Sequence, residues 1–177
     1  MAKKLAQGLV QVYTGEGKGK TTAALGLAFR ALGRGFKVFM LQFLKSEDNG
    51  ELHACRLFGD HFLIEQTGLN GFIRPDRIAA ADIQRAQQAL HRAREILTSG
   101  DYDLVILDEI NMAMYFELIS VREVLTLLQD RAPHVEAILT GRGAPQAIMD
   151  AADLVTEMRN LKHYYDAGVQ ARCGIEL

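Results

Sequence analysis

The chain of 177 residues lacks most of the features that mark a specialised class of protein. It has two cysteines, Cys55 and Cys173, and neither lies in a CxxC pair, so we expect no disulfide framework and a reduced, cytoplasmic setting. It has no run of about 18 apolar residues, so no membrane-spanning helix and no membrane partner are expected. Its net charge of −2, from 20 basic and 22 acidic residues, gives no general attraction to nucleic acid.

Short apolar segments alternate with segments of helical periodicity, and no linker, repeat or low-complexity stretch divides the chain. This rhythm predicts an α/β fold: one domain over residues 1–177, with a mostly parallel central sheet and helices on both faces. In such sheets, ligands bind beyond the carboxyl ends of the strands. The predicted strands are 9–13, 36–44, 61–66, 102–109, 135–141 and 153–158, and the predicted helices are 20–32, 76–98, 120–128 and 144–152.

The predicted helices carry two local signals. Ser120 and Glu123 have the spacing of a capping box, which predicts a helix start. In the longest predicted helix, residues 76–98, apolar residues recur at steps of three and four and should form one buried face. That face would consist of Ala79, Ile83, Ala86, Leu90, Ala93 and Leu97.

A glycine-rich segment follows the first predicted strand and ends in Gly19-Lys20-Thr21. Gly15, Gly17 and Gly19 allow tight turning of the backbone, so that successive amide groups can surround phosphate oxygens. The positive end of the following helix adds to this attraction, and Lys20 supplies a full charge. The spacing is one residue shorter than the usual phosphate-loop pattern, which predicts a tighter loop.

Two further motifs fall at predicted strand ends. An apolar strand ends in Asp108 and Glu109, and carboxylates beside a phosphate loop can hold magnesium directly or through water. Glu109 could instead orient an attacking water in an ATPase. Arg142 lies between Gly141 and Gly143 after the next strand, where it can reach a phosphate with two hydrogen bonds or simply lie at the surface.

The chain resembles the ATP:corrinoid adenosyltransferase family in three motifs and in its ending. The motifs are, in order, "TGEGKGKTTAA", "VILDEIN" and "ILTGRGAP", and the ending is "KHYYDAGVQARCGIEL". The resemblance covers nearly the whole chain and implies a single-domain RecA-like P-loop fold. It implies transfer of the 5′-deoxyadenosyl group of ATP to the cobalt(I) of a corrinoid in cobalamin biosynthesis or salvage. Inorganic triphosphate would leave, and ATP would lie reversed in the loop relative to most P-loop enzymes. A homodimer and a reductant protein such as a flavodoxin are implied as well.

The resemblance also assigns roles to individual residues. It implies catalytic roles for Lys20, Glu109 and Arg142, and a magnesium site at Thr21 and Glu109. Glu16 is expected to turn toward the ribose hydroxyls or to pair with a neighbouring lysine. The full set of ATP-binding candidates is Gly15, Glu16, Gly17, Lys18, Gly19, Lys20, Thr21, Thr22 and Arg142.

The corrinoid-binding candidates lie in "EQTGLNGFIRP", and they are Leu69, Asn70 and Phe72. The best-known members of the family carry a phenylalanine and a tryptophan at the positions of Leu69 and Gly71, and those rings expel the axial ligand of cobalt. Leu69 can still exclude water, whereas Gly71 cannot.

Two alternatives to the transferase remain open from the residues alone. The first is a RecA-like ATPase or small-molecule kinase, which would release ADP rather than triphosphate. The second is a nucleotide-gated corrinoid-binding protein that binds ATP without turnover.

Overall fold

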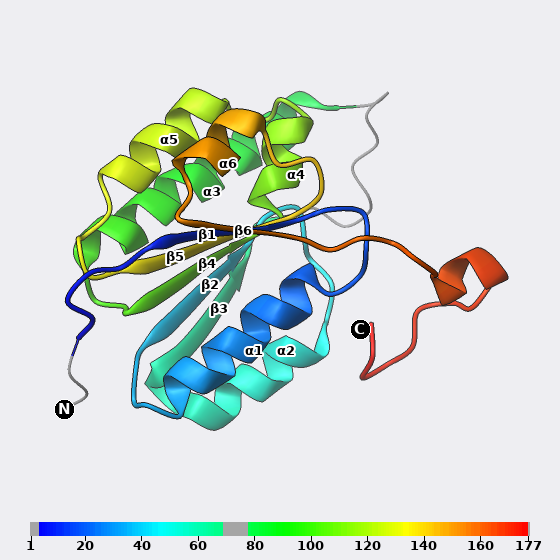
Figure 1. Ribbon diagram of the computed structural model, residues 1–177, viewed down its shortest axis with the longest axis horizontal. Helices are drawn as coiled ribbons and strands as arrows, with labels where there is room; N and C mark the ends of the chain where they lie inside the picture. Colours follow the sequence, from blue (N-terminus) through cyan, green and yellow to red (C-terminus); the bar gives the residue numbers. More distant parts are fainter. Residues whose placement is uncertain (1–3, 69–77, 177) are drawn as a thin grey trace.

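The computed structural model describes residues 4–68 and 78–176. Its centre is a six-stranded sheet in which every pair of neighbouring strands is parallel, with helices on both faces (Figure 1). This confirms the predicted α/β class. The strands are β1 (Val10–Thr14), β2 (Val38–Gln42), β3 (Phe62–Gln66), β4 (Leu104–Asp108), β5 (Glu136–Thr140) and β6 (Leu154–Glu157), in the spatial order β3-β2-β4-β5-β1-β6.

The helices divide between the two faces of the sheet (Figure 1). One face carries α3 (Ala80–Ser99), α4 (Ile110–Tyr115), α5 (Val121–Gln129) and α6 (Gln146–Ala151), and the other carries α1 (Lys20–Leu32) and α2 (Gly50–Ala54). The prediction for α1 matches its observed bounds. The sequence did not predict α2 or α4, since five or six residues show little helical period, whereas the equally short α6 lies within the predicted helix 144–152. None of the helices in the two described ranges is long and apolar enough to cross a bilayer.

Strand β2 shows why the apolar run around it is continuous. Phe39 and Leu41 are fully buried in the larger core cluster, which includes residues of α3 and α5. Val38 and Met40 point the other way and are fully buried in the cluster that contains Ala24 and Ala28 of α1. Successive side chains of a strand face opposite sides, so a strand covered by helices on both faces requires apolar residues at every position.

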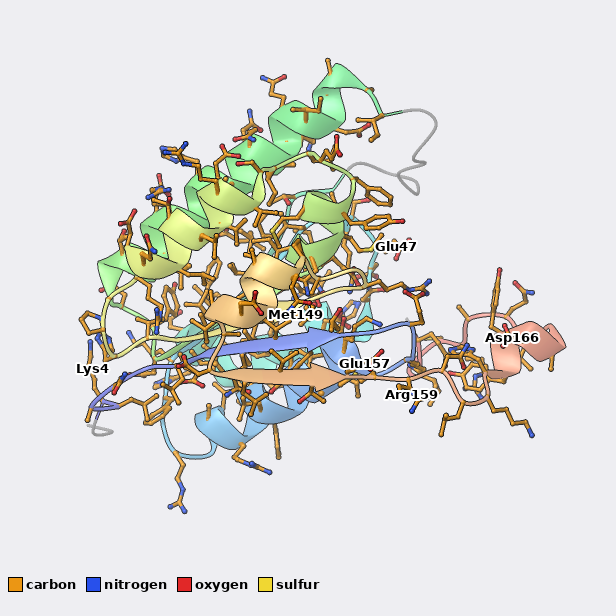
Figure 2. The ribbon with its side chains drawn as sticks, turned by 45° about the horizontal axis from the view of Figure 1, so that its top comes forward. Lys4, Glu47, Met149, Glu157, Arg159 and Asp166 are labelled. Atoms are coloured by element: carbon orange, nitrogen blue, oxygen red, sulfur yellow. The ribbon has the colours of Figure 1, made fainter. Side chains whose placement is uncertain are left out.

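The buried face of α3 differs at its start from the predicted one. Ala79 and Ile83 were predicted to be buried, but Ala79 is exposed and Ile83 is 44% exposed. The first turn of α3 extends past the sheet (Figure 2), and Ala80 and Ala81 are exposed there as well. Further along, Ala86, Leu90, Ala93 and Leu97 are buried as predicted, joined by Ala89 and Ile96.

The start of α5 confirms the predicted capping box. The amide of Glu123 donates to Ser120 Oγ at 3.2 Å, and the amide of Ser120 donates to Glu123 Oε2 at 2.8 Å. Two backbone donors that the first turn leaves without helical partners are thereby satisfied.

The strand order brings the predicted motifs to one edge of the sheet. Because β5 separates β1 from β4, the loop after β1 and the acid at the end of β4 lie on either side of Thr140, the last residue of β5. Gln42 at the end of β2 is paired in register with Asp108. On the other side of β1, strand β6 is exposed along its length, and the chain continues from Glu157 through Arg159 to a turn around Asp166 that projects from the body (Figure 2).

Candidate functional site

The glycine loop after β1 has a backbone that needs its glycines. Gly15 and Gly19 have φ angles of 96° and 120°, which L side chains rarely adopt. Gly17 has no room for a side chain, because an added Cβ would lie 2.7 Å from the carbonyl oxygen of Met158. The Gly17 amide donates to that same carbonyl at 2.6 Å. The segment after β6 therefore forms one wall of the loop.

Lys20, the first residue of α1, is buried and turned into this loop. Its Nζ donates to the carbonyl oxygens of Gly15 at 2.7 Å and Gly17 at 2.8 Å. Burial lowers the pKa of Lys20, and Arg142 acts in the same direction, while the charge of Glu109 opposes the shift. The ammonium thus lies where the loop closes around it, bonded to two carbonyl groups that an incoming anion can replace.

The other predicted residues of the loop face different ways. Thr21 Oγ1 donates to Asp108 Oδ1 at 2.8 Å, whereas Thr22 is exposed in the first turn of α1. Lys18 is turned toward the C-terminal segment, where its Nζ donates to the carbonyl oxygen of Ile175 at 3.3 Å. The structure therefore brings Lys20 and Thr21 to the carboxyl edge of the sheet and directs Lys18 to the outer rim.

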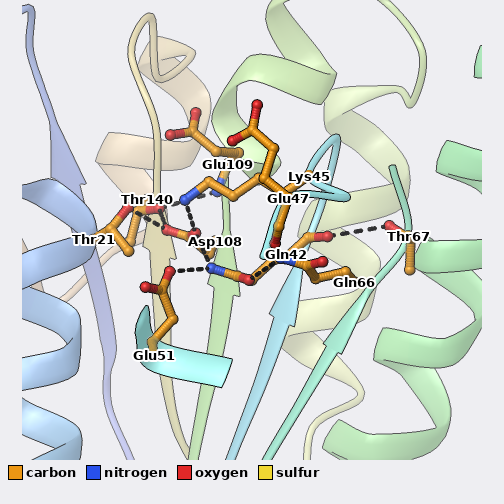
Figure 3. Close-up of polar contacts among 10 residues, drawn as sticks. All are labelled: Thr21, Gln42, Lys45, Glu47, Glu51, Gln66, Thr67, Asp108, Glu109 and Thr140. Carbon is orange, nitrogen blue, oxygen red and sulfur yellow. Dashed lines mark hydrogen bonds and ion pairs between the residues drawn. The ribbon is translucent and has the colours of Figure 1, made fainter. Parts of the chain in front are cut away.

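Asp108 is the centre of the polar network at this edge (Figure 3). Its carboxylate is fully buried and accepts four hydrogen bonds. Oδ1 accepts from the hydroxyls of Thr21 at 2.8 Å and Thr140 at 2.6 Å. Oδ2 accepts from Lys45 Nζ at 2.7 Å and from Gln42 Nε2 at 3.2 Å. These donors satisfy the acceptor sites of the carboxylate, so Asp108 acts by holding its neighbours.

Glu109 follows in a backbone conformation that is uncommon for a residue with a side chain. Its φ angle is 61°, and its amide donates to Thr140 Oγ1 at 3.0 Å. The turn separates the two acids, so that Asp108 stays inside the network while Glu109 lies above it (Figure 3). Burial raises the pKa of Glu109, and the neighbouring Asp108 adds to the rise, against the charges of Lys45, Lys20 and Arg142.

Arg142 pairs with Glu16 across the mouth of the site. Arg142 Nη1 lies 3.3 Å from Glu16 Oε2, and both side chains are more than half exposed. The sequence predicted that Glu16 would turn outward, toward the ribose hydroxyls, or pair with a neighbouring lysine. The side chain of Glu16 is exposed, and its partner is an arginine rather than a lysine. An exposed ion pair of this kind contributes at most about 1 kcal/mol, so Arg142 is readily available to another anion.

Sequence reasoning missed several members of this site. Thr140, Gln42 and Lys45 were not among the predicted residues, although each lies at or just beyond the carboxyl end of a strand. Polar side chains at the end of an otherwise apolar strand are the signal that could have found them. The corrinoid-binding candidates Leu69, Asn70 and Phe72 lie outside the described residues.

The P-loop class of α/β proteins is defined by features that this structure has. They are a parallel sheet with a glycine loop after its first strand, a buried lysine at the start of the next helix, and an acid at the end of a nearby strand. Residues 6–177 match the family described as ATP:corrinoid adenosyltransferase BtuR/CobO/CobP. The chain belongs to this family.

Individual relatives agree with the family match. A corrinoid adenosyltransferase of Escherichia coli (strain K12) is 37% identical over 171 residues, covering 96% of this chain and 86% of the relative. Another, from Pseudomonas aeruginosa, is 37% identical over 180 residues, covering 98% and 88%. The solved structure of flagellar accessory protein FlaH from Methanocaldococcus jannaschii has a TM-score of 0.61 at 14% identity, covering 86% of this chain and 72% of that one, and it supports the fold alone.

Proposed function

We propose that this protein transfers the 5′-deoxyadenosyl group of ATP to the cobalt(I) of a corrinoid and releases inorganic triphosphate. The observation that carries the proposal is the family match over residues 6–177, which includes the loop, the acidic strand end and the arginine turn. The alternatives of an ATPase, a kinase or a binding protein without turnover have no comparable support.

The geometry of the loop suits a triphosphate that leaves. When the bond between the ribose 5′ carbon and the phosphate oxygen breaks, negative charge grows on the triphosphate. Lys20, the loop amides and Arg142 are the groups that would bind this charge, and they would bind it more strongly in the transition state than in the ground state. Lys20 would leave the carbonyls of Gly15 and Gly17 for the phosphate oxygens, and Arg142 would leave Glu16. Cobalt(I) is itself a strong nucleophile, so the chain needs no general base.

The residues at the site also fit a magnesium ion. Thr21 gives its hydroxyl hydrogen to Asp108, so the lone pairs of its oxygen are free for a cation. Glu109 adds a carboxylate nearby, and Mg²⁺ is commonly held by one or two protein ligands together with substrate phosphates. We therefore propose that Thr21 and Glu109 hold it, and that Asp108 holds Thr21. When bound, the ion would neutralise charge on the triphosphate.

Several further parts of the proposal follow the family. Residues 1–177 would act as one domain in the cytoplasm, as a homodimer, with Leu69, Asn70 and Phe72 toward the corrinoid. A reductant protein such as a flavodoxin would supply the electron that makes cobalt(I).

The products of the reaction test the proposed function. Incubation with ATP, Mg²⁺ and chemically reduced cob(I)alamin should give a light-sensitive cobalt–carbon product and one equivalent of triphosphate. Release of ADP would support the ATPase or kinase instead. ATP binding without any adenosylated product would support the binding protein.

The ion pair at the mouth of the site gives a second test. In Glu16→Gln, Arg142 loses its partner and the incoming triphosphate meets one negative charge fewer, so ATP should bind about two- to fivefold more tightly. Calorimetry measures this affinity. Repeating Glu16→Gln in an Arg142→Ala background shows how much of the gain in ATP affinity acts through the arginine. Weaker binding by Glu16→Gln would instead indicate that Glu16 contacts the nucleotide.

A further inference from the structure

Lys45 lies just beyond β2, outside every motif that pointed to the site. Leu44, the residue before it, has a φ angle of 60°, an uncommon conformation for a leucine that turns the chain sharply after the strand. The side chain of Lys45 is only 21% exposed and reaches back over the sheet edge to Asp108 (Figure 3). A lysine that is mostly buried and contacts the polar network of a nucleotide site is expected to have a specific role there.

The contact between Lys45 and Asp108 is the strongest one on its side of the carboxylate. The distance from Nζ to Oδ2 is 2.7 Å, and both groups carry charge. The other donor to Oδ2, Gln42 Nε2, is neutral, lies at 3.2 Å and is shared with Glu51 Oε1 at 2.9 Å. Burial acts to lower the pKa of Lys45, but the charge and hydrogen bond of Asp108 outweigh it and raise the pKa.

The backbone of Lys45 is fixed as firmly as its side chain. The amide of Gly68 donates to the carbonyl oxygen of Lys45 at 2.8 Å. A Cβ at Gly68 would lie 2.5 Å from the backbone of Leu44 and Lys45, so the two segments are in direct contact. Thr67 binds the carbonyl oxygen of Gln42 through its amide at 3.1 Å and its hydroxyl at 3.3 Å. Lys45 is therefore held at both ends and reaches Asp108 from a defined position.

We propose that Lys45 is a positioning residue of the nucleotide site, which acts through Asp108. It holds Oδ2, so that Oδ1 stays turned to Thr21 and Thr140. Thr21 then keeps its hydrogen on Asp108 and its lone pairs toward the nucleotide and its cation. This role rests on the proposed function, but it concerns ATP binding and can be measured without the transfer reaction.

The test is a double-mutant cycle on ATP affinity, measured by calorimetry with Mg²⁺ and without corrinoid. Lys45→Met should weaken ATP binding about 10- to 100-fold, as is common when an outer-shell partner of a metal site is lost. In an Asp108→Asn background the same change should alter ATP affinity less than about twofold, because Lys45 has lost the charge it acts on. Lys37→Met, at the exposed residue just before the same strand, is the matched control and should bind ATP as tightly as the unsubstituted protein does.

Four outcomes would overturn the inference. Lys45→Met could keep its ATP affinity within about twofold of the unsubstituted protein. Alternatively, Lys45→Met could lower ATP affinity by the same factor in both backgrounds, which would mean that Lys45 does not act through Asp108. In steady-state kinetics, KM should rise for ATP and stay constant for the reduced corrinoid, and a fall in kcat alone would indicate a purely structural role. If Lys45→Met does not fold, the comparison of Asp108→Asn with the double variant still decides the question, since a difference in ATP affinity above about twofold contradicts the proposal. Failure of the proposed function would appear separately, because the protein without substitutions would then form no triphosphate.

Discussion

Replacement of Lys20 by methionine is expected to lower kcat/KM for adenosyl transfer by about 100- to 1,000-fold, the range seen when a charge-stabilising group is removed from an active site. Lys20 is the buried cation of the loop, and its Nζ lies 2.7 and 2.8 Å from the two carbonyls that phosphate oxygens would replace. The charge that it would meet grows as the triphosphate leaves. Most of the loss should therefore appear in kcat rather than in ATP affinity.

The neighbouring lysine offers a graded comparison for this result. Lys18 is partly exposed and turned to the C-terminal segment. Lys18→Met should therefore lower kcat/KM by less than about tenfold, as expected of a group at the rim. Stopped-flow measurement of the cobalt–carbon product separates the two variants, and thermal melts check that both are folded. Equal losses in both variants would show that Lys20 has no special place in the reaction.

The second large effect is expected from Gly17→Ala. An added methyl group would lie 2.7 Å from the carbonyl oxygen of Met158 and 2.8 Å from the backbone of Arg159, and neither can move without displacing the chain after β6. A shift of the loop by about 1 Å can cost a rate factor on the order of 100, so kcat/KM should fall by about that much. ATP affinity should fall with it, because the amides of the loop no longer converge.

Gly26→Ala is the matched control for this substitution. Gly26 lies inside α1, and a Cβ there would meet nothing within 4 Å. Alanine favours a helix by about 0.5–1 kcal/mol over glycine, so this variant should be slightly more stable and fully active. Thermal melts and ATP titrations of the two variants make the comparison. An active Gly17→Ala would mean that the wall formed by Met158 is not needed.

Local sequence signals predicted those parts of the structure that depend on neighbouring residues. Short-range patterns gave the bounds of α1, the capping box at Ser120 and the apolar strand before the two acids, and the structure confirms these elements. The strand ends at Asp108, however, rather than including Glu109 as predicted. The loop glycines were also singled out correctly as positions with special backbone demands, although the partner that crowds Gly17 lies about 140 residues away in the sequence.

The network around Asp108 could not be predicted in the same way. Its four donors come from three segments that lie far apart in the sequence: the start of α1, the end of β2 with the loop after it, and the end of β5. No local pattern indicates that Thr21, Gln42, Lys45 and Thr140 meet. The sequence offered both acids as possible magnesium ligands, and the family resemblance assigned the metal site to Glu109 rather than Asp108. The structure shows Asp108 accepting from four donors. The buried face of α3 was wrong at Ala79 and Ile83 because periodicity cannot tell where a helix leaves the sheet.

The wall behind the glycine loop also bears on how the protein matures. Gly15 and Gly17, near the beginning of the chain, take their shape against Glu157, Met158 and Arg159, near its end. During synthesis the loop is made long before these residues leave the ribosome. A nascent chain would therefore have no finished cradle for ATP, and nucleotide could stabilise only the protein whose C-terminal segment has already been released.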